Sequence, residues 1–358
     1  MKEETRNYII TISFVFILIL FLALNIFSSD KEISVSERRK LLQFSDVTLD
    51  NFEEYASDQF VGRDFFRKVK SEFSTKILKQ KDDNGVFIKN GAIYKMEYPV
   101  NENNVKKTAE KINKVYDKYL KDIKGKIYYS VIPDKNYYLE DKNVLKLDLK
   151  KIEGILKNNL SNNMKYISIV DSLELEDYYK TDLHWKQENL EDVVKVLKSE
   201  MNTISNFEEF DNIYKIENKG EFYGSYYSQI SNNVNPDNLN ILTNDVINNC
   251  KTYNYETKKQ GRIYTEKNSY DKYDIFLEGA TPLIDIENNS SKTDKELLIF
   301  RDSFGSSIAP LLIDNYKKIV LIDLRYISYE LLEEYIEFKN QDVLFLYNTL
   351  IINQNNLK

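Results

Sequence analysis

The sequence is poor in the side chains that most often bind metals. Its 358 residues include one histidine, His184, one cysteine, Cys250, and one tryptophan, Trp185. A single cysteine excludes a disulfide within the chain and any metal site built from several cysteines. We therefore expect no metal and no other cofactor, and we interpret Cys250 as a small buried apolar residue.

The chain also lacks a cluster of basic residues. Its 50 lysines and arginines are outnumbered by 57 aspartates and glutamates, which gives a formal net charge of −7. This balance argues against nucleic acid as a partner. A content of 42% hydrophobic and 30% charged residues is typical of a folded core rather than a disordered chain. The 27 tyrosines are either sugar-stacking platforms or a compositional habit of the genome, and the sequence leaves both open.

One long uncharged run stands near the amino terminus. Residues 8–27, YIITISFVFILILFLALNIF, would span about 30 Å as a helix, which matches the hydrocarbon core of a bilayer. No convincing Ala-x-Ala cleavage site follows, so we expect a retained transmembrane anchor. The positive charges of Lys2 and Arg6 place residues 1–7 in the cytoplasm and the rest of the chain on the extracytoplasmic side of the cell membrane. Three basic residues at positions 38–40 oppose this bias.

Beyond the anchor, we expect a polar linker over residues 28–48 and one domain over residues 49–358. Short apolar runs, separated by segments long enough for helices, occur at residues 296–300, 318–323 and 342–347. Such runs are typical of strands buried on both faces of a parallel sheet. They predict an α/β fold with a mainly parallel sheet. Residues 202–295 are less regular and are a possible insertion.

Local patterns add further elements. Asn90-Gly91, between two alternating apolar runs, predicts a β-hairpin over residues 85–95. Apolar residues at helical spacing predict helices within residues 52–79, 105–123 and 188–201. A strand that stops at Pro133 is expected within residues 126–135, and another at residues 165–171.

A serine follows one of the predicted buried strands. In LLIFRDSFGSSIAPLLI (297–313), the strand ends at Phe300 and an apolar helix begins near Ser306. A serine on such a turn is exposed at the carboxyl edge of the sheet, where helix amides can stabilise a developing negative charge. Ser303 is therefore a candidate nucleophile. The alternative is that Asp302, Ser303 or Ser306 only caps the helix.

The single histidine lies in YYKTDLHWK, two residues after Asp182. In an extended segment these two side chains project to the same side. Asp182 could then orient the imidazole of His184 and leave its other nitrogen free as a base. The alternative is an ordinary local hydrogen bond. A serine mechanism needs a base, and His184 is the only histidine available for it.

These stretches resemble the motifs of a known group of proteins. YYKTDLHWK resembles the Asp-x-His-Trp signature of the DHHW proteins and of the alginate O-acetylation proteins. FRDSFGSS resembles their serine-bearing block, which is akin to that of SGNH hydrolases. Three further stretches are similar to family segments and occur in the expected order: YASDQFVGRDFF (55–66), IPDK (132–135) and FYGSYY (222–227).

The resemblance implies a fold and a set of site residues. The fold is an SGNH hydrolase-like α/β/α sandwich with a permuted motif order, preceded by one transmembrane helix. The site is a triad of Ser303 as nucleophile, His184 as general base and Asp182 as the residue that orients His184. Arg325 and Asn348 resemble acyl-site or oxyanion residues, although a structural role explains each of them equally well.

The chain also departs from the family pattern. The second histidine of the DHHW signature is Leu183 here, so no essential imidazole can stand at that position. The Asp-x-x-His spacing usual in SGNH hydrolases is also lacking.

The implied function is a membrane-anchored, extracytoplasmic O-acetyltransferase. It would move an acetyl group through a serine ester onto a cell-surface or secreted polysaccharide, with a membrane-bound O-acyltransferase as acyl donor. One alternative is a carbohydrate acetylesterase with the same triad, in which water is the acceptor. Another is a non-catalytic subunit of a polysaccharide-modification assembly. The sequence does not identify the polysaccharide, and acetyl is the acyl group by family analogy only.

Overall fold

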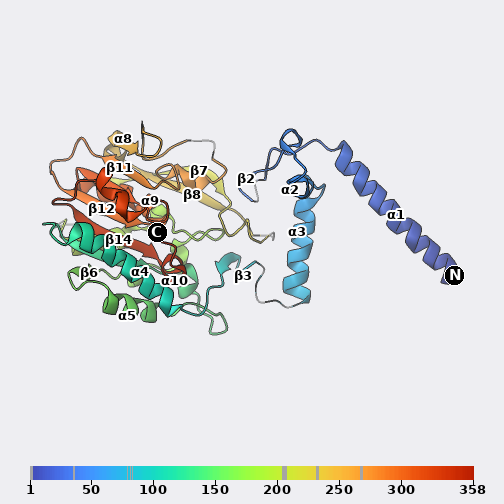
Figure 1. Cartoon of the computed structure of the whole chain (residues 1–358), viewed down its shortest axis with the longest axis horizontal. Helices are drawn as coiled ribbons and strands as arrows, with labels where there is room; N and C mark the ends of the chain where they lie inside the picture. Colours follow the sequence, from blue (N-terminus) through green and yellow to red (C-terminus); the bar gives the residue numbers. More distant parts are fainter. Residues whose placement is uncertain are drawn as a thin grey trace. The chain divides into compact units, whose positions relative to one another are not determined.

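The chain folds as two compact units, Met1–Asn84 with Tyr227–Asn233, and Gly85–Tyr226 with Val234–Lys358 (Figure 1). A computed structural model describes residues 3–34, 37–78, 80, 82, 84–203, 208–230, 234–266 and 269–358. The boundary between the units at residues 84 and 85 differs from the domain start that the sequence suggested at residue 49.

The first unit contains the apolar helix. Helix α1 (Glu3–Phe27) has 25 residues and none of its side chains is buried. It is the one helix of the described residues that is long and apolar enough to cross a membrane, and it is compatible with a single-pass anchor.

The rest of the first unit contains two short strands within the predicted linker, residues 28–48, and two helices after it. Its elements are β1 (Ile33–Ser34), β2 (Arg39–Lys40), α2 (Phe52–Asp58) and α3 (Arg63–Glu72), which continues in a wider turn over Phe73–Ile77. The helix predicted within residues 52–79 is interrupted at Gly62, whose φ of +79° is left-handed. Arg39 forms an ion pair with the buried Asp58 and ties the predicted linker to α2.

The second unit is built on an eight-stranded sheet of order β10-β9-β11-β13-β12-β14-β5-β6. The strands from β13 to β6 run parallel, and the other three are antiparallel to their neighbours. Their bounds are β5 (Ile127–Ile132), β6 (Met164–Tyr166), β9 (Lys251–Asn254), β10 (Lys259–Gly261), β11 (Leu283–Glu287), β12 (Glu296–Arg301), β13 (Lys318–Ile322) and β14 (Asp342–Asn348). The predicted α/β fold with a mainly parallel sheet is confirmed.

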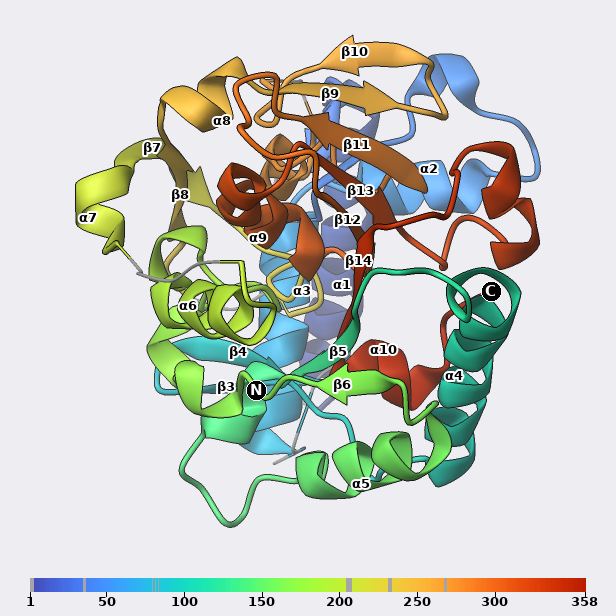
Figure 2. The same ribbon diagram turned by 90° about the vertical axis from the view of Figure 1, so that its left-hand side faces the viewer.

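Helices cover both faces of this sheet, as Figure 2 shows for α6 and α9 on one face and α4 and α10 on the other. On β12, Leu297 and Ile299 enter one apolar core, while Leu298 and Phe300 enter the other. The apolar run therefore has no polar face, as its sequence predicted. The helices on the first face are α6 (Glu191–Glu200) and α9 (Phe304–Leu312), and those on the second are α4 (Glu102–Val115), α5 (Leu149–Asn159) and α10 (Thr349–Gln354).

Residues 202–295 contribute in part to this sheet. Strands β9, β10 and β11 extend it, whereas β7 (Lys215–Phe222) and β8 (Asp237–Thr243) form a separate antiparallel ribbon. Two short helices, α7 (Phe210–Ile213) and α8 (Asp245–Asn249), flank the ribbon in the sequence. The strand expected at residues 165–171 is β6, which ends at Tyr166; three irregular residues lie between it and a helical turn at Val170–Ser172.

The predicted hairpin is present as β3 (Val86–Lys89) and β4 (Ala92–Lys95). Asn90 and Gly91 both have positive φ, at 49° and 75°. A tight two-residue hairpin loop requires such angles, and Asn-Gly adopts them readily.

Candidate active site

Ser303 lies where β12 passes into α9, at the carboxyl edge of the parallel strands. Helix α9 begins at Phe304, two residues earlier than the start near Ser306 that the sequence suggested. Asp302 accepts a hydrogen bond from the Phe304 N–H at 3.0 Å and so caps the helix. The Ser303 side chain makes no capping bond. The capping role therefore falls to Asp302, and the Ser303 hydroxyl is directed elsewhere.

The Ser303 hydroxyl meets the single histidine. Its Oγ lies 2.7 Å from Nε2 of His184, although 119 residues separate the two in the sequence. The other ring nitrogen, Nδ1, contacts Oδ1 of Asp182. Asp182 is fully buried and His184 is 6% exposed, whereas Ser303 is half-buried. The structure thus brings a hydroxyl, an imidazole and a carboxylate into one chain of hydrogen bonds.

The segment that carries Asp182 and His184 is a compact turn rather than the extended strand that the sequence suggested. Tyr178 pairs with Trp185 across its base, and Tyr179 N donates to His184 O at 3.0 Å. Within the turn, Asp182 Oδ1 accepts the His184 backbone N–H at 2.9 Å. This is the local bond of an Asx-turn, which brings side chains two residues apart together without an extended backbone.

Aromatic rings fix the orientation of the imidazole. The Tyr273 ring stacks on His184 at 3.8 Å between centroids and 9° between planes, and Phe304 packs beside it at 4.8 Å. Trp185, the neighbour of the histidine, donates from Nε1 to Ser307 Oγ at 2.8 Å on α9. Leu183, which replaces the second histidine of the DHHW signature, is partly buried against the apolar core.

Gly224 and Ser225 complete the surroundings of Asp182, and the sequence assigned them no role. The Ser225 N–H donates to Asp182 Oδ2. A Cβ added at Gly224 would lie 2.2 Å from Cβ of Asp182, so only glycine fits there. The sequence offered one signal for these two residues, their position within the family-like stretch FYGSYY. A glycine in such a stretch often marks a place where the backbone approaches another segment closely.

Lys135 is a second supporting residue that the sequence left unassigned. Its ammonium is buried and donates to three carbonyl oxygens: Tyr179 at 2.8 Å, Lys180 at 3.1 Å and Asp182 at 2.7 Å. Burial lowers its pKa to about 8, and burial raises the pKa of the neighbouring Asp134 to about 6. The ammonium thus binds the backbone of the turn that carries Asp182.

Arg325 is engaged with Asp323. Its Nε and Nη2 donate to the two carboxylate oxygens of Asp323 at 2.9 and 2.7 Å. Burial opposes the charge of Arg325, but these hydrogen bonds hold its pKa above the usual range. The buried Arg301 reaches the same carboxylate at 3.4 Å, and burial lowers its pKa. The Arg325 side chain is 17% exposed and makes a bidentate pair with the fully buried Asp323.

Asn348 is also engaged within the structure. Its Oδ1 caps α10 by accepting the Leu350 N–H at 2.8 Å, and its Nδ2 donates to Pro133 O at 3.4 Å. Its backbone N–H donates to Asp302 Oδ2 at 2.7 Å, which ties the end of β14 to the end of β12. Burial raises the pKa of Asp302.

The Ser303 backbone N–H is available to donate a further hydrogen bond. Across the described ranges, the hydrogen bonds leave it without an acceptor. It opens helix α9, whose first amides carry a partial positive charge. A carbonyl carbon attacked by Ser303 Oγ would place its oxygen within reach of this N–H.

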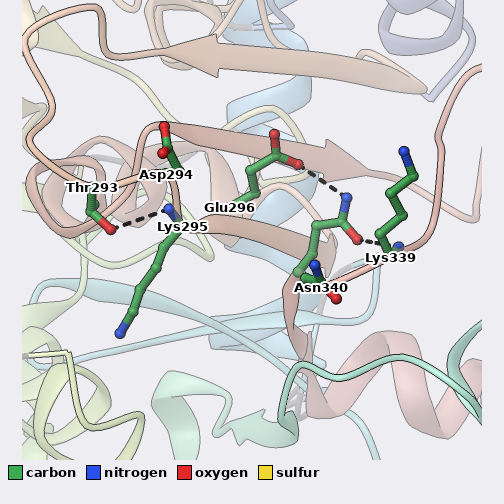
Figure 3. A pocket seen from close by; sticks show the side chains of 7 residues that line it. Thr293, Asp294, Lys295, Glu296, Lys339 and Asn340 are labelled. Atoms are coloured by element: carbon green, nitrogen blue, oxygen red, sulfur yellow. Dashed lines mark hydrogen bonds between the residues drawn. The ribbon is translucent and has the colours of Figure 1, made fainter.

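A polar pocket lies at the opposite edge of the sheet, where β12 and β14 begin (Figure 3). It is lined by Thr293, Asp294, Lys295, Glu296, Lys339, Asn340 and Gln341. Gln341 Nε2 donates to Glu296 Oε2 at 3.0 Å across it. It contains neither Ser303 nor His184, so its residues take no part in the hydrogen-bonded chain. No cluster of three or more metal-ligating side chains occurs in the part of the chain that the structure describes.

Solved structures share this architecture. A DHHW family protein from Eubacterium siraeum matches with a TM-score of 0.62 and 19% identity, over 77% of this chain and 95% of its own. The chain has the fold of a DHHW family protein. Bacillus cereus PatB1 matches with a TM-score of 0.60 and 18% identity, over 75% of this chain and 96% of its own. PatB1 with a sulfonyl adduct gives 0.61, with 18% identity over 76% and 98% of the two chains.

The O-acetyltransferase domain of Pseudomonas putida AlgJ is more distant, with a TM-score of 0.47 and 11% identity over 75% of this chain and 92% of its own. No protein-family model matches the sequence, and no curated protein matches it significantly. The likeness to these structures shows the fold, so the chemistry must be argued from the side chains at the edge of the sheet.

Proposed function

We propose that this protein is an O-acetyltransferase that carries the acetyl group on Ser303 and passes it to a polysaccharide. The observation that carries the proposal is the contact of Ser303 Oγ with His184 Nε2 at 2.7 Å, with Asp182 at the other ring nitrogen. A hydroxyl becomes a useful nucleophile when a base so placed takes its proton. The resemblance of the Asp-x-His-Trp and serine blocks to acetylation proteins supports acyl transfer.

In the first half-reaction, His184 Nε2 takes the hydroxyl proton as Ser303 Oγ forms a bond to the carbonyl carbon of the acyl donor. Asp182 accepts from Nδ1–H, which keeps Nε2 unprotonated beforehand and stabilises the imidazolium afterwards. The Ser303 N–H donates to the oxyanion of the tetrahedral intermediate. That intermediate collapses as the bond to the leaving group breaks and His184 returns the proton to it. Ser303 is left as an acetyl ester.

In the second half-reaction, a sugar hydroxyl takes the place of the leaving group. His184 removes its proton, the hydroxyl oxygen attacks the ester carbonyl, and the Ser303–acetyl bond breaks. The proton returns to Ser303 Oγ. Helix α1 would hold the enzyme at the extracytoplasmic face of the membrane, where a membrane-bound O-acyltransferase would deliver the acetyl group.

The test is a partition experiment. The purified protein is incubated with a chromogenic acetyl ester in the presence and absence of a soluble polysaccharide, and acetate and acetylated sugar are measured separately. We expect acetylated sugar that depends on Ser303 and disappears in Ser303→Ala. Acetate alone, at a rate that the polysaccharide does not change, would instead identify a carbohydrate acetylesterase. Equal rates for the native protein and Ser303→Ala would contradict any role for this serine.

A further inference from the structure

Helix α3 and the turn that follows it leave a row of apolar side chains uncovered. Phe65 is 64% exposed, Val69 47%, Phe73 48% and Ile77 64%. Their spacing of four residues places them along one face of the helix. Soluble proteins rarely expose a continuous apolar strip of this kind, and one that remains exposed commonly marks an interaction surface.

The polar face of α3 is held by its own unit. Arg63 forms an ion pair with Glu37 at 2.9 Å, and Arg67 donates to the Ser228 carbonyl at 2.9 Å. Both partners belong to the same compact unit as α3. The helix therefore cannot turn its apolar face inward without breaking these contacts.

The segment just before α3 is fixed to the apolar helix α1. The Phe60 ring stacks on Phe21 at 5.8 Å with 5° between the planes, and Phe66 meets the edge of Phe21 at 5.7 Å. Asn25 Oδ1 accepts the Val61 N–H at 2.9 Å. Phe21 lies six residues before the end of α1, or about 9 Å along its axis. Where α1 spans a bilayer, Phe60 and Phe66 therefore lie at the depth of the acyl chains.

We propose that α3 is an interfacial helix that inserts Phe65, Val69 and Phe73 among the lipids at the membrane surface where α1 emerges. Near its start, Phe66 contacts α1 below the point where α1 emerges, and the exposed apolar face of α3 continues from there. Amphipathic helices of this kind bury their apolar face about 5–10 Å into the boundary between headgroups and acyl chains. The inference rests on α1 as the anchor and is independent of the acetyl-transfer chemistry. Insertion of α3 gives the first unit a second attachment to the bilayer.

The experiment uses the full chain reconstituted in phosphatidylcholine vesicles, with a nitroxide on a shallow carbon of the acyl chain. Val69→Trp and, in a second preparation, Phe73→Trp report on the apolar face. Asp64→Trp is the matched control, because Asp64 is exposed and lies about 140° around the same helix from Val69. The signal of the buried Trp185 is subtracted by using the unmodified protein.

We expect blue-shifted emission and strong nitroxide quenching for Val69→Trp and Phe73→Trp, and weak quenching for Asp64→Trp. Quenching of both apolar-face reporters by aqueous iodide would show that the face is in water. Protection from both iodide and nitroxide would show that protein covers it. Either result would overturn the proposal, whatever the transferase assay gives.

Discussion

Replacing Asp182 with asparagine tests how the imidazole is held. Three N–H groups converge on the buried carboxylate: the His184 backbone N–H and ring Nδ1 face Oδ1, and the Ser225 N–H faces Oδ2. Asparagine offers one oxygen and one amide NH₂ in place of two oxygens. If the NH₂ faces His184, Nδ1 must act as acceptor, the proton moves to Nε2, and Nε2 can no longer take the proton of Ser303. If the NH₂ faces Ser225, two donors oppose each other.

Each orientation therefore breaks at least one hydrogen bond to residue 182, and the tautomer protonated at Nε2 leaves Ser303 without a base. We expect Asp182→Asn to lower kcat by about 10³- to 10⁴-fold, equivalent to about 4–5.5 kcal/mol of barrier, with a smaller change in KM. The assay is the steady-state rate with a chromogenic acetyl ester, alongside a melting curve. Asp285→Asn is the control, because Asp285 is a buried carboxylate that pairs with Lys318 in the middle of the sheet. A loss of kcat below tenfold in Asp182→Asn would refute the role given to Asp182.

The supporting residues Gly224 and Lys135 give three further predictions. Gly224→Ala places a Cβ 2.2 Å from that of Asp182 and should lower kcat at least tenfold. The control Gly154→Ala, in open space on α5, should keep full activity and add about 0.5–1 kcal/mol of stability. Equal activities of the two variants would show that the close approach of Gly224 to Asp182 is not required. Lys135→Met should lower the melting temperature at neutral pH, because it leaves three carbonyls of the turn without their donor. Burial lowers the Lys135 pKa to about 8, so from about pH 8 to its ordinary pKa of about 10.4 the unfolded chain binds more protons than the folded one. The free energy of unfolding of the native protein, measured in urea, should therefore rise relative to Lys135→Met across that window, and a difference that stays constant with pH would contradict the buried-ammonium assignment.

The parts of the fold that follow from local pattern could be predicted from the sequence. The apolar runs of β12, β13 and β14 identify strands buried on both faces, because no polar side chain interrupts them. Asn90-Gly91 identifies a hairpin, because few other pairs accept two positive φ angles. Ser303 at the end of β12 follows from the same reasoning, since a parallel strand presents its carboxyl end at one edge of the sheet.

The remaining features depend on contacts between distant segments. The turn around Asp182 is compact because Lys135 binds its carbonyls from 44 to 47 residues away, and a lysine in a sequence ordinarily indicates an exposed side chain. Gly224 matters only because Asp182 lies against it. Asn348 and Arg325 stand at the edge that the sequence indicated, but capping and the pair with Asp323 occupy their polar groups. Helical spacing within residues 52–79 predicted a helix without showing that its apolar face would remain uncovered.

The most direct test of the account is to observe the acyl group on the enzyme. The full chain is incubated with an activated acetyl ester, and intact-protein mass spectrometry is followed by peptide mapping. We predict one added acetyl group on Ser303 in the native protein, and none in Ser303→Ala or His184→Ala. An acetyl group on another residue, or equal labelling of the native protein and Ser303→Ala, would contradict the central claim that Ser303 is the nucleophile.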